Sequence, residues 1–161
     1  MEPTMDFRYV DLKDIDPNFT LLDGPEFYNL RITKAEFSSY TAKKETKTQQ
    51  VGDEVTTVKL ALTVVDHPKF TGRKLWETLY PGEFSFKVCR RIEDATGVQQ
   101  TGSLEDWLKE LSNVQPVIKV QVDQIPDTIG NPPQPNPKTV KPDGTPGLKN
   151  IVAWRAGVQP E

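Results

Sequence analysis

Two aromatic residues and a lysine stand close together in residues 73–80. Trp76 and Tyr80 are four positions apart, and Lys74 precedes the tryptophan by two. In a strand, all three side chains share one face, with the two rings about 13 Å apart along it. Flat rings can stack on unpaired bases, each for roughly 1–3 kcal/mol, and lysines can contact phosphate. The spacing therefore predicts a surface for an extended single strand of nucleic acid.

Other residues can extend this surface. Lys59 has the matching parity on the preceding predicted strand, 55–66, and Arg73 stands at the start of the aromatic strand. Tyr40 comes directly before a polar and basic segment, 41–54, which predicts a loop. Lysines of this loop can contact phosphate, and each such contact makes binding more dependent on salt. These lysines are Lys43, Lys44 and Lys47.

Each of these residues also has a structural interpretation. Trp76 can pack beneath the N-terminal segment, Tyr80 can be held by the adjacent Pro81, and the loop lysines can simply be solvated. Phe70, in the turn before the aromatic strand, is weighed as a further ligand contact. Trp154, near the end of the chain, is expected in the core.

The elements that must position these residues are three strands, a helical insert and two more strands. In the first strand the apolar parity shifts between Ile32 and Ala35, which predicts a bulge. Five strands with a helix between the third and fourth match the OB fold. We therefore predict a mainly β chain, a five-stranded OB-fold Greek-key barrel with a helical insert between strands 3 and 4. Alternating apolar and polar residues place the strands at about 27–40, 55–66, 73–80, 117–125 and 148–156.

The insert, residues 83–113, is predicted to form two helices. Apolar residues recur at helical spacing in the first, and Gly97 is expected to end it. Ser103, with Asp106 three residues later, predicts the start of the second helix. Its buried stripe is expected to be Leu104, Leu108 and Leu111.

The 161 residues suit one domain with an additional segment. Residues 1–24 are expected to form an acidic N-terminal arm, and residues 25–161 the OB-fold domain. Residues 126–147 hold seven of the 14 prolines and predict a stiff, extended loop between strands 4 and 5. Lys138 and Lys141 can make this loop a clamp on the nucleic acid; a disordered spacer and a proline-motif ligand are the alternatives.

The net charge of −3 counts against a simple nucleic-acid-binding domain, because such domains are usually basic. The charges are unevenly distributed, however. Residues 1–27 hold 7 acidic and 2 basic residues, whereas residues 31–75 hold 5 acidic and 9 basic residues. The local field of the first three strands can therefore attract a polyanion.

Nothing in the sequence orients a set of catalytic residues, and the ligands for the common metal sites are missing. Cys89 is the only cysteine and His67 the only histidine, so a disulfide within the chain, a two-histidine metal site and a cysteine cluster for zinc are excluded. No phosphate-binding glycine-rich loop is present. We expect no enzyme, no catalytic residue, no metal ligand and no cofactor, and Cys89 is expected to be structural.

No apolar run is long enough to span a membrane, and residues 1–19 are acidic without a signal-peptide pattern. These features predict a cytoplasmic protein that does not bind a membrane.

The segment Phe70-Thr71-Gly72-Arg73-Lys74-Leu75-Trp76 has the form Phe-x-Gly-Arg-x-(apolar)-Trp after a strand. From this segment and its neighbours, residues 5 to about 122 resemble a family of bacteriophage single-stranded-DNA-binding proteins of OB type. The accompanying segments are Met5-Asp6-Phe7, Leu21-Leu22-Asp23-Gly24, Phe27-Tyr28-Asn29-Leu30-Arg31-Ile32, Leu60-Ala61-Leu62-Thr63-Val64-Val65 and Gly97-Val98.

The resemblance implies binding and protection of single-stranded DNA in phage replication, recombination or repair, in the host cytoplasm. It places DNA against strands two and three, which maps onto Lys59, Arg73, Lys74 and Trp76. Replication and recombination proteins of phage or host are the implied partners. Many proteins of this functional type recruit them through an acidic tail, which the final residues, with one acid, do not match.

Two other functions fit the same fold class. One is a protein-interaction module that presents the acidic arm or the Pro-rich loop to a partner. The other is a phage structural accessory β-domain. Binding of oligo-dT that weakens steeply with salt separates DNA binding from the first, and assembly into large particles would support the second. The sequence leaves oligomeric state, site size and preference between DNA and RNA open.

Overall fold

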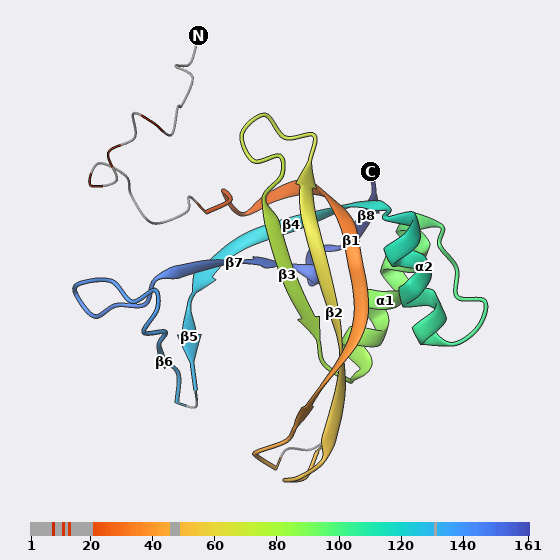
Figure 1. Ribbon diagram of the computed structural model, residues 1–161, viewed down its shortest axis with the longest axis horizontal. Helices are drawn as coiled ribbons and strands as arrows, with labels where there is room; N and C mark the ends of the chain where they lie inside the picture. Colours follow the sequence, from red (N-terminus) through yellow and green to blue (C-terminus); the bar gives the residue numbers. More distant parts are fainter. Residues whose placement is uncertain (1–7, 9–10, 12, 14–20, 46–48, 131) are drawn as a thin grey trace.

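A strongly curled antiparallel sheet with two helices beside it makes up the molecule (Figure 1). The computed structural model describes residues 8, 11, 13, 21–45, 49–130 and 132–161. The strand order is β3-β2-β1-β4-β7, and β8 also pairs with β4. These strands are β1 (Glu26–Thr41), β2 (Glu54–Val65), β3 (Lys74–Leu79), β4 (Val117–Pro126), β7 (Leu148–Val152) and β8 (Val158–Pro160).

The long first strand explains the curl. β1 pairs with β2 from Asn29 to Thr41 but with β4 only from Glu26 to Arg31. The predicted bulge is confirmed, because the register with β2 shifts between Ile32 and Lys34. A bulge bends a strand and increases its twist, so β1 can leave β4 while it remains paired with β2. Its apolar side chains on the concave side enter the core.

The two helices follow β3, as the sequence predicts, and the second of them lies beside β1 (Figure 1). Gly97, at φ 73°, ends α1 (Glu83–Thr96), and its N–H donates to the carbonyl oxygen of Glu93 at 3.0 Å. The Ser103 side chain accepts from the Asp106 N–H at the start of α2 (Leu104–Val114), which confirms the predicted cap. At the edge of β1, Ser112 Oγ of α2 accepts from the Ala35 N–H at 2.9 Å.

The two outermost strands of the curled sheet, β3 and β7, are not joined by a ladder in the part of the chain that the structure describes. The sheet is therefore a half-barrel with a seam between these strands. A side chain of β3 crosses the seam instead, because the Val152 N–H donates to Glu77 Oε1 at 3.1 Å.

The end of the chain differs from the single predicted strand at 148–156. β7 ends at Val152 and is followed by a 3₁₀ turn, η3 (Trp154–Ala156). Gly157, at φ 109°, then lets the chain turn so that β8 pairs with a second stretch of β4. Trp154 is buried in this turn, as predicted for a core residue.

The Pro-rich segment was predicted as an extended loop without packing, and this prediction is wrong. The Asp127 side chain is 8% exposed and accepts a hydrogen bond from Thr139 Oγ1 at 2.8 Å. Lys149 Nζ lies 3.9 Å from the same carboxylate, and the Asn136 N–H donates to the Asp127 carbonyl oxygen at 3.0 Å. One buried carboxylate thus organises the segment, which includes the short pair β5 (Thr128–Ile129) and β6 (Gln134–Pro135).

Most of the predicted acidic arm lies outside the described residues. From residue 21 onward the chain is held against β7, because the Asn150 side-chain amide exchanges two hydrogen bonds of 2.9 Å with the backbone of Leu22. Among the described residues, no helix has the length and apolar character needed to cross a membrane.

Candidate nucleic-acid interface

Trp76 lies on the outer, convex face of the sheet and is 71% exposed. Its neighbours on β3, Leu75 and Glu77, point to the other side, as strand alternation requires. The strand register places Trp76 opposite Ala61 of β2, and Ala61 opposite Lys34 of β1. The small Ala61 side chain leaves the indole uncovered on that side. Of the two interpretations of Trp76 that the sequence left open, the structure shows the exposed one.

Basic side chains lie on both sides of the indole along the sheet. On one side, the register aligns Lys74 with Thr63 and Thr63 with Arg31. On the other side, Lys59 lies opposite Thr78. Neighbouring strands are about 4.8 Å apart, so Arg31 and Lys74 are about 10 Å apart at their backbones. The three cations are exposed and present positive charge around Trp76.

Two cations of β1, Lys34 and Arg31, have interactions of their own. Lys34 Nζ lies 3.3 Å from Glu36 Oε2, so its charge is largely offset. The Arg31 guanidinium donates to the Gln115 carbonyl oxygen at 2.8 Å, which fixes the direction of its side chain. Because Arg31 is anchored in this way, it can contact phosphate without losing as much side-chain entropy as a mobile lysine.

A pair of tyrosines continues the aromatic surface beyond the end of β3. The rings of Tyr40 and Tyr80 meet edge to face, with their centroids 6.1 Å apart. Tyr80 is 58% exposed, and Tyr40 donates its hydroxyl to Gln49 Oε1 at 3.0 Å. Edge-to-face contact holds both rings in a defined orientation. The structure thus brings Tyr40 and Tyr80 together from two segments of the predicted site, beyond the end of the strand that carries Trp76.

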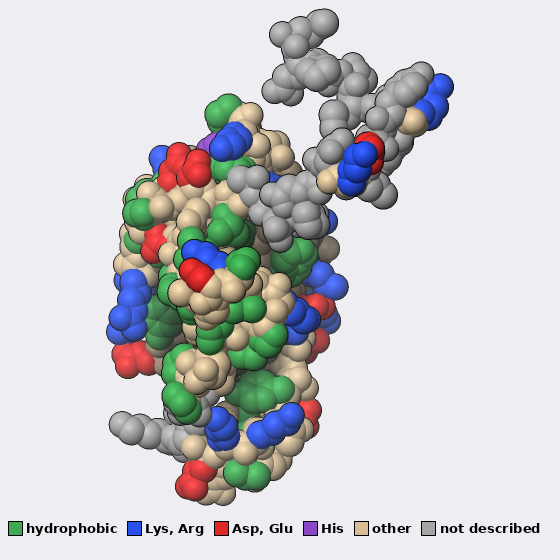
Figure 2. All heavy atoms as spheres, turned by 90° about the vertical axis from the view of Figure 1, so that its left-hand side faces the viewer, with side chains coloured by type: hydrophobic (Ala, Val, Ile, Leu, Met, Phe, Trp, Pro, Cys, Tyr) green, Lys and Arg blue, Asp and Glu red, His purple; other side chains and the backbone are tan. Residues whose placement is uncertain are grey.

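The remaining predicted contacts lie farther from this surface. Lys43 and Lys44 are exposed beyond the end of β1, where the β1–β2 hairpin projects past the rest of the sheet (Figure 1). Lys47 lies outside the described residues. Arg73 directly precedes β3 and is partly buried. Its carbonyl oxygen accepts a hydrogen bond from the Val64 N–H, and its own N–H donates to the Phe70 carbonyl oxygen. Figure 2 shows acidic and basic side chains interspersed on the end of the molecule that bears β5 and β6.

Phe70, which was weighed as a further ligand contact, is buried in the structure. Its side chain is 2% exposed and packs against Tyr28 and His67. His67 Nδ1 accepts from the N–H groups of Lys69 and Phe70, each at 3.1 Å, and so closes the turn between β2 and β3. This role of His67 was not predicted. Burial, followed by the contact with Glu26, raises the pKa of the Tyr28 hydroxyl far above its usual range.

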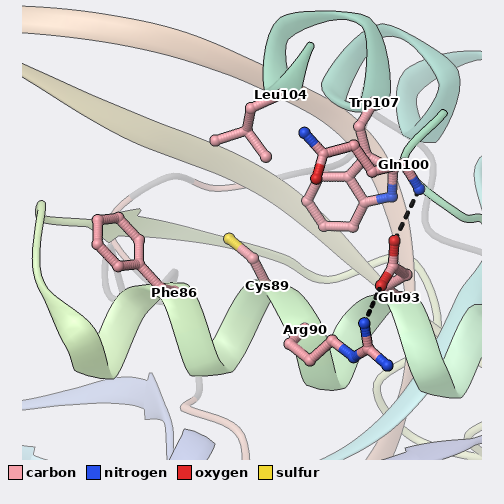
Figure 3. Close-up of a pocket in the computed structure, with 7 residues that line it drawn as sticks. All are labelled: Phe86, Cys89, Arg90, Glu93, Gln100, Leu104 and Trp107. Carbon is pink, nitrogen blue, oxygen red and sulfur yellow. Dashed lines mark hydrogen bonds and ion pairs between the residues drawn. The ribbon is translucent and has the colours of Figure 1, made fainter. Parts of the chain in front are cut away.

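A separate hollow lies between the two helices (Figure 3). Phe86, Cys89, Leu104 and Trp107 supply most of its apolar lining, while Glu93 is bound by Arg90 at 3.2 Å and by the Gln100 N–H at 2.7 Å. Burial raises the pKa of the Cys89 thiol, which makes it a weaker nucleophile at neutral pH. Across the described ranges, no group of histidine, cysteine or acidic residues could hold a metal ion.

Comparison of the chain with family models, curated proteins and solved structures found no match. The function of the chain must therefore be inferred from the outer face of the sheet and from the residues arranged there.

Proposed function

We propose that the chain binds single-stranded DNA without sequence specificity on the outer face of β1, β2 and β3, as a protein of OB type. One observation carries the proposal: a tryptophan that is 71% exposed stands in the middle of a sheet, with cations aligned on both sides of it. The exposure of this tryptophan in the middle of a sheet calls for an explanation, because burial of a tryptophan side chain is strongly favourable. Stacking on bases supplies one.

The topology supports the OB assignment. A bent first strand shared by two parts of the sheet, and helices between the third and fourth long strands, are features expected of that fold. OB folds bind oligonucleotides on the face of their second and third strands. Trp76, Lys59 and Lys74 occupy that face here.

The residues around the indole favour non-specific binding. A base stacked on Trp76 meets Ala61, Thr63 and Thr78 nearby, none of which has the forked side chain that reads a base edge with two hydrogen bonds. Lys59 and Lys74 contribute point charges for phosphate, and contacts of that kind carry no sequence information. Stacking tolerates any base because every base has a flat face.

The biological role that we propose is protection of single strands in phage replication, recombination or repair. It follows from the resemblance of residues 5–122 to phage proteins of this class. Replication and recombination proteins would then be partners.

The test is a fluorescence-anisotropy titration of the full chain with labelled oligo-dT, poly-U and duplex DNA at several salt concentrations. We expect oligo-dT to bind more tightly than duplex DNA, with an affinity that falls steeply as salt rises. Absence of oligo-dT binding at low salt contradicts the proposal and favours a protein-interaction or structural role.

A further inference from the structure

The seam between β3 and β7 is joined by one carboxylate. Glu77, on the edge strand β3, accepts a hydrogen bond from the Val152 N–H of β7 at 3.1 Å. The Trp154 side chain, in the turn that follows β7, donates to the same carboxylate. Within the described residues these bonds replace the backbone ladder that would close a barrel.

The surroundings of Glu77 are mostly apolar. It points to the opposite side of β3 from Trp76 and lies opposite the buried Leu60 of β2. Trp154 and Phe84 of α1 also border the space next to it. An ionised carboxylate in such a place loses most of its hydration and keeps only the donors that the protein provides.

Few charges offset this loss. Lys149 of β7 acts on Glu77 through space. Arg91 of α1 is directed elsewhere, because it donates to the Trp154 carbonyl oxygen at 3.1 Å, and Arg155 of η3 lies over the Phe84 ring. Burial outweighs the opposing effects of Val152, Trp154 and Lys149, and it raises the pKa of Glu77 to about 7.

We propose that Glu77 is a proton-dependent bracket: the seam is closed while the carboxyl group holds its proton, and loss of the proton favours an open seam. In the open seam water reaches the carboxylate, and the cost of burying its charge disappears. The protonated group can still accept from the Val152 N–H through its carbonyl oxygen. Because the open form binds the proton less tightly than the closed form, a rise in pH shifts the population toward the open form.

The bracket bears on DNA binding through Trp76, and this part rests on the proposed function. Trp76 and Glu77 are adjacent on β3, and within the described ranges a ladder holds β3 on its β2 side alone. Opening the seam releases the other side of the strand that carries the indole. The closed form therefore holds Trp76 and Lys74 in fixed positions for stacking and phosphate contact, and the open form does not.

The first experiment follows the Val152 amide and the Trp154 indole N–H by ¹H–¹⁵N NMR from about pH 5.5 to about pH 8.5. In the unmodified chain we expect both signals to shift together with a midpoint near neutrality. In Glu77→Gln, which keeps the shape but cannot ionise, neither signal should shift. Glu105→Gln, an exposed carboxylate on α2, is the matched control and should titrate like the unmodified chain.

Signals of Val152 and Trp154 that do not move with pH in the unmodified chain overturn the bracket, and this result needs no variant. Movement that persists in Glu77→Gln overturns it as well. If Glu77→Gln does not fold, the ¹³C signal of the Glu77 carboxyl in the unmodified chain decides, because a midpoint near the ordinary value of a glutamate contradicts the proposal.

The second experiment measures oligo-dT affinity at about pH 6 and about pH 8. We expect the unmodified chain to bind about 3- to 10-fold more weakly at the higher pH and Glu77→Gln to bind equally at both. Equal pH dependence in both proteins contradicts the link to Trp76. If no oligo-dT binds at either pH, the proposed function fails, while the NMR titration still decides on the bracket.

Discussion

Trp76 and Ala61 face each other across the ladder between β3 and β2, on the convex side of the sheet. A large side chain at residue 61 would pack against the indole, as cross-strand neighbours do. Alanine leaves the ring exposed. This pairing, one ring opposite one methyl group, makes the stacking surface available.

Ala61→Phe should therefore cover the indole and weaken oligo-dT binding, by up to the roughly 1–3 kcal/mol that one stacked base contributes. Iodide quenching of tryptophan fluorescence measures the solvent accessibility of the Trp76 indole, because Trp107 and Trp154 are buried and Trp76 is the exposed tryptophan. Ala61→Ser is the control and should leave quenching and affinity unchanged. Strong quenching in Ala61→Phe contradicts the prediction.

Trp76→Ala should weaken oligo-dT binding by roughly 1–3 kcal/mol, or about 5- to 150-fold, because it removes the central stacking ring. Ile129→Ala is the control, since Ile129 is 51% exposed on β5, which belongs to a separate two-stranded sheet. Anisotropy titrations measure both, and circular dichroism verifies the fold. A folded Trp76→Ala protein with unchanged affinity removes this surface as the DNA site.

The double variant Lys59→Gln and Lys74→Gln should reduce the slope of log affinity against log salt by about 1.4, because each phosphate contact to a single strand contributes about 0.7. Lys109→Gln, an exposed lysine of α2, should leave the slope unchanged. The measurement is a titration at four or more salt concentrations. An unchanged slope in the double variant shows that these two lysines do not contact phosphate.

Strand alternation was sufficient to predict the direction of Trp76. Leu75 and Leu79 are apolar and Lys74 and Thr78 are polar, so one face of β3 had to be buried and the other exposed. The sequence also predicted the end of α1 and the start of α2. A left-handed glycine at Gly97 and a side-chain cap at Ser103 each involve residues within one helical turn, so nearby sequence is enough to indicate them.

Contacts between distant segments were not predictable in the same way. The burial of Phe70 could not be decided from the sequence because it depends on Tyr28, which is far away in the sequence. The bond between Glu77 and Val152 joins residues 75 positions apart, and no local pattern indicates it. Proline content suggested an extended segment at 126–147, but one buried acid, Asp127, overrides that tendency.

The stability of the fold should decrease as pH rises through the window set by Glu77. Between the ordinary pKa of 4.5 and the folded value of about 7, the folded state holds a proton that the unfolded state has lost. The free energy of unfolding therefore falls with rising pH across this window. The contribution of Glu77 is complete below pH 4.5 and lost above about 7. It amounts to at most about 3 kcal/mol, since one pKa unit corresponds to about 1.4 kcal/mol.

Urea unfolding at about pH 5 and about pH 8 measures this fall. Glu77→Gln should show a smaller fall than the unmodified chain, and Glu105→Gln should show the same fall. Stability that increases from the lower to the higher pH in the unmodified chain, and not in Glu77→Gln, contradicts the assigned sign.

Asp127→Ala should loosen the Pro-rich segment without unfolding the sheet. The substitution removes the acceptor of Thr139 Oγ1 and the partner of Lys149, and loss of a buried hydrogen-bonding partner costs about 1–3 kcal/mol. Because the carboxylate contacts residues on both sides of the segment, we expect the cost to appear as local opening of residues 128–147 rather than as global unfolding.

Limited proteolysis followed by mass spectrometry locates that opening. We expect tryptic cleavage after Lys138 in Asp127→Ala at protease concentrations that leave this bond of the unmodified chain intact. Asp143→Asn is the control: Asp143 is exposed and bonds only within its own turn, to Thr145, among the described residues. Equal cleavage of the unmodified chain and Asp127→Ala contradicts the organising role of Asp127. If oligo-dT protects the bond after Lys138 at higher protease concentrations that do cleave the unmodified chain, the predicted clamp by Lys138 and Lys141 gains support, because DNA then covers the cleavage site.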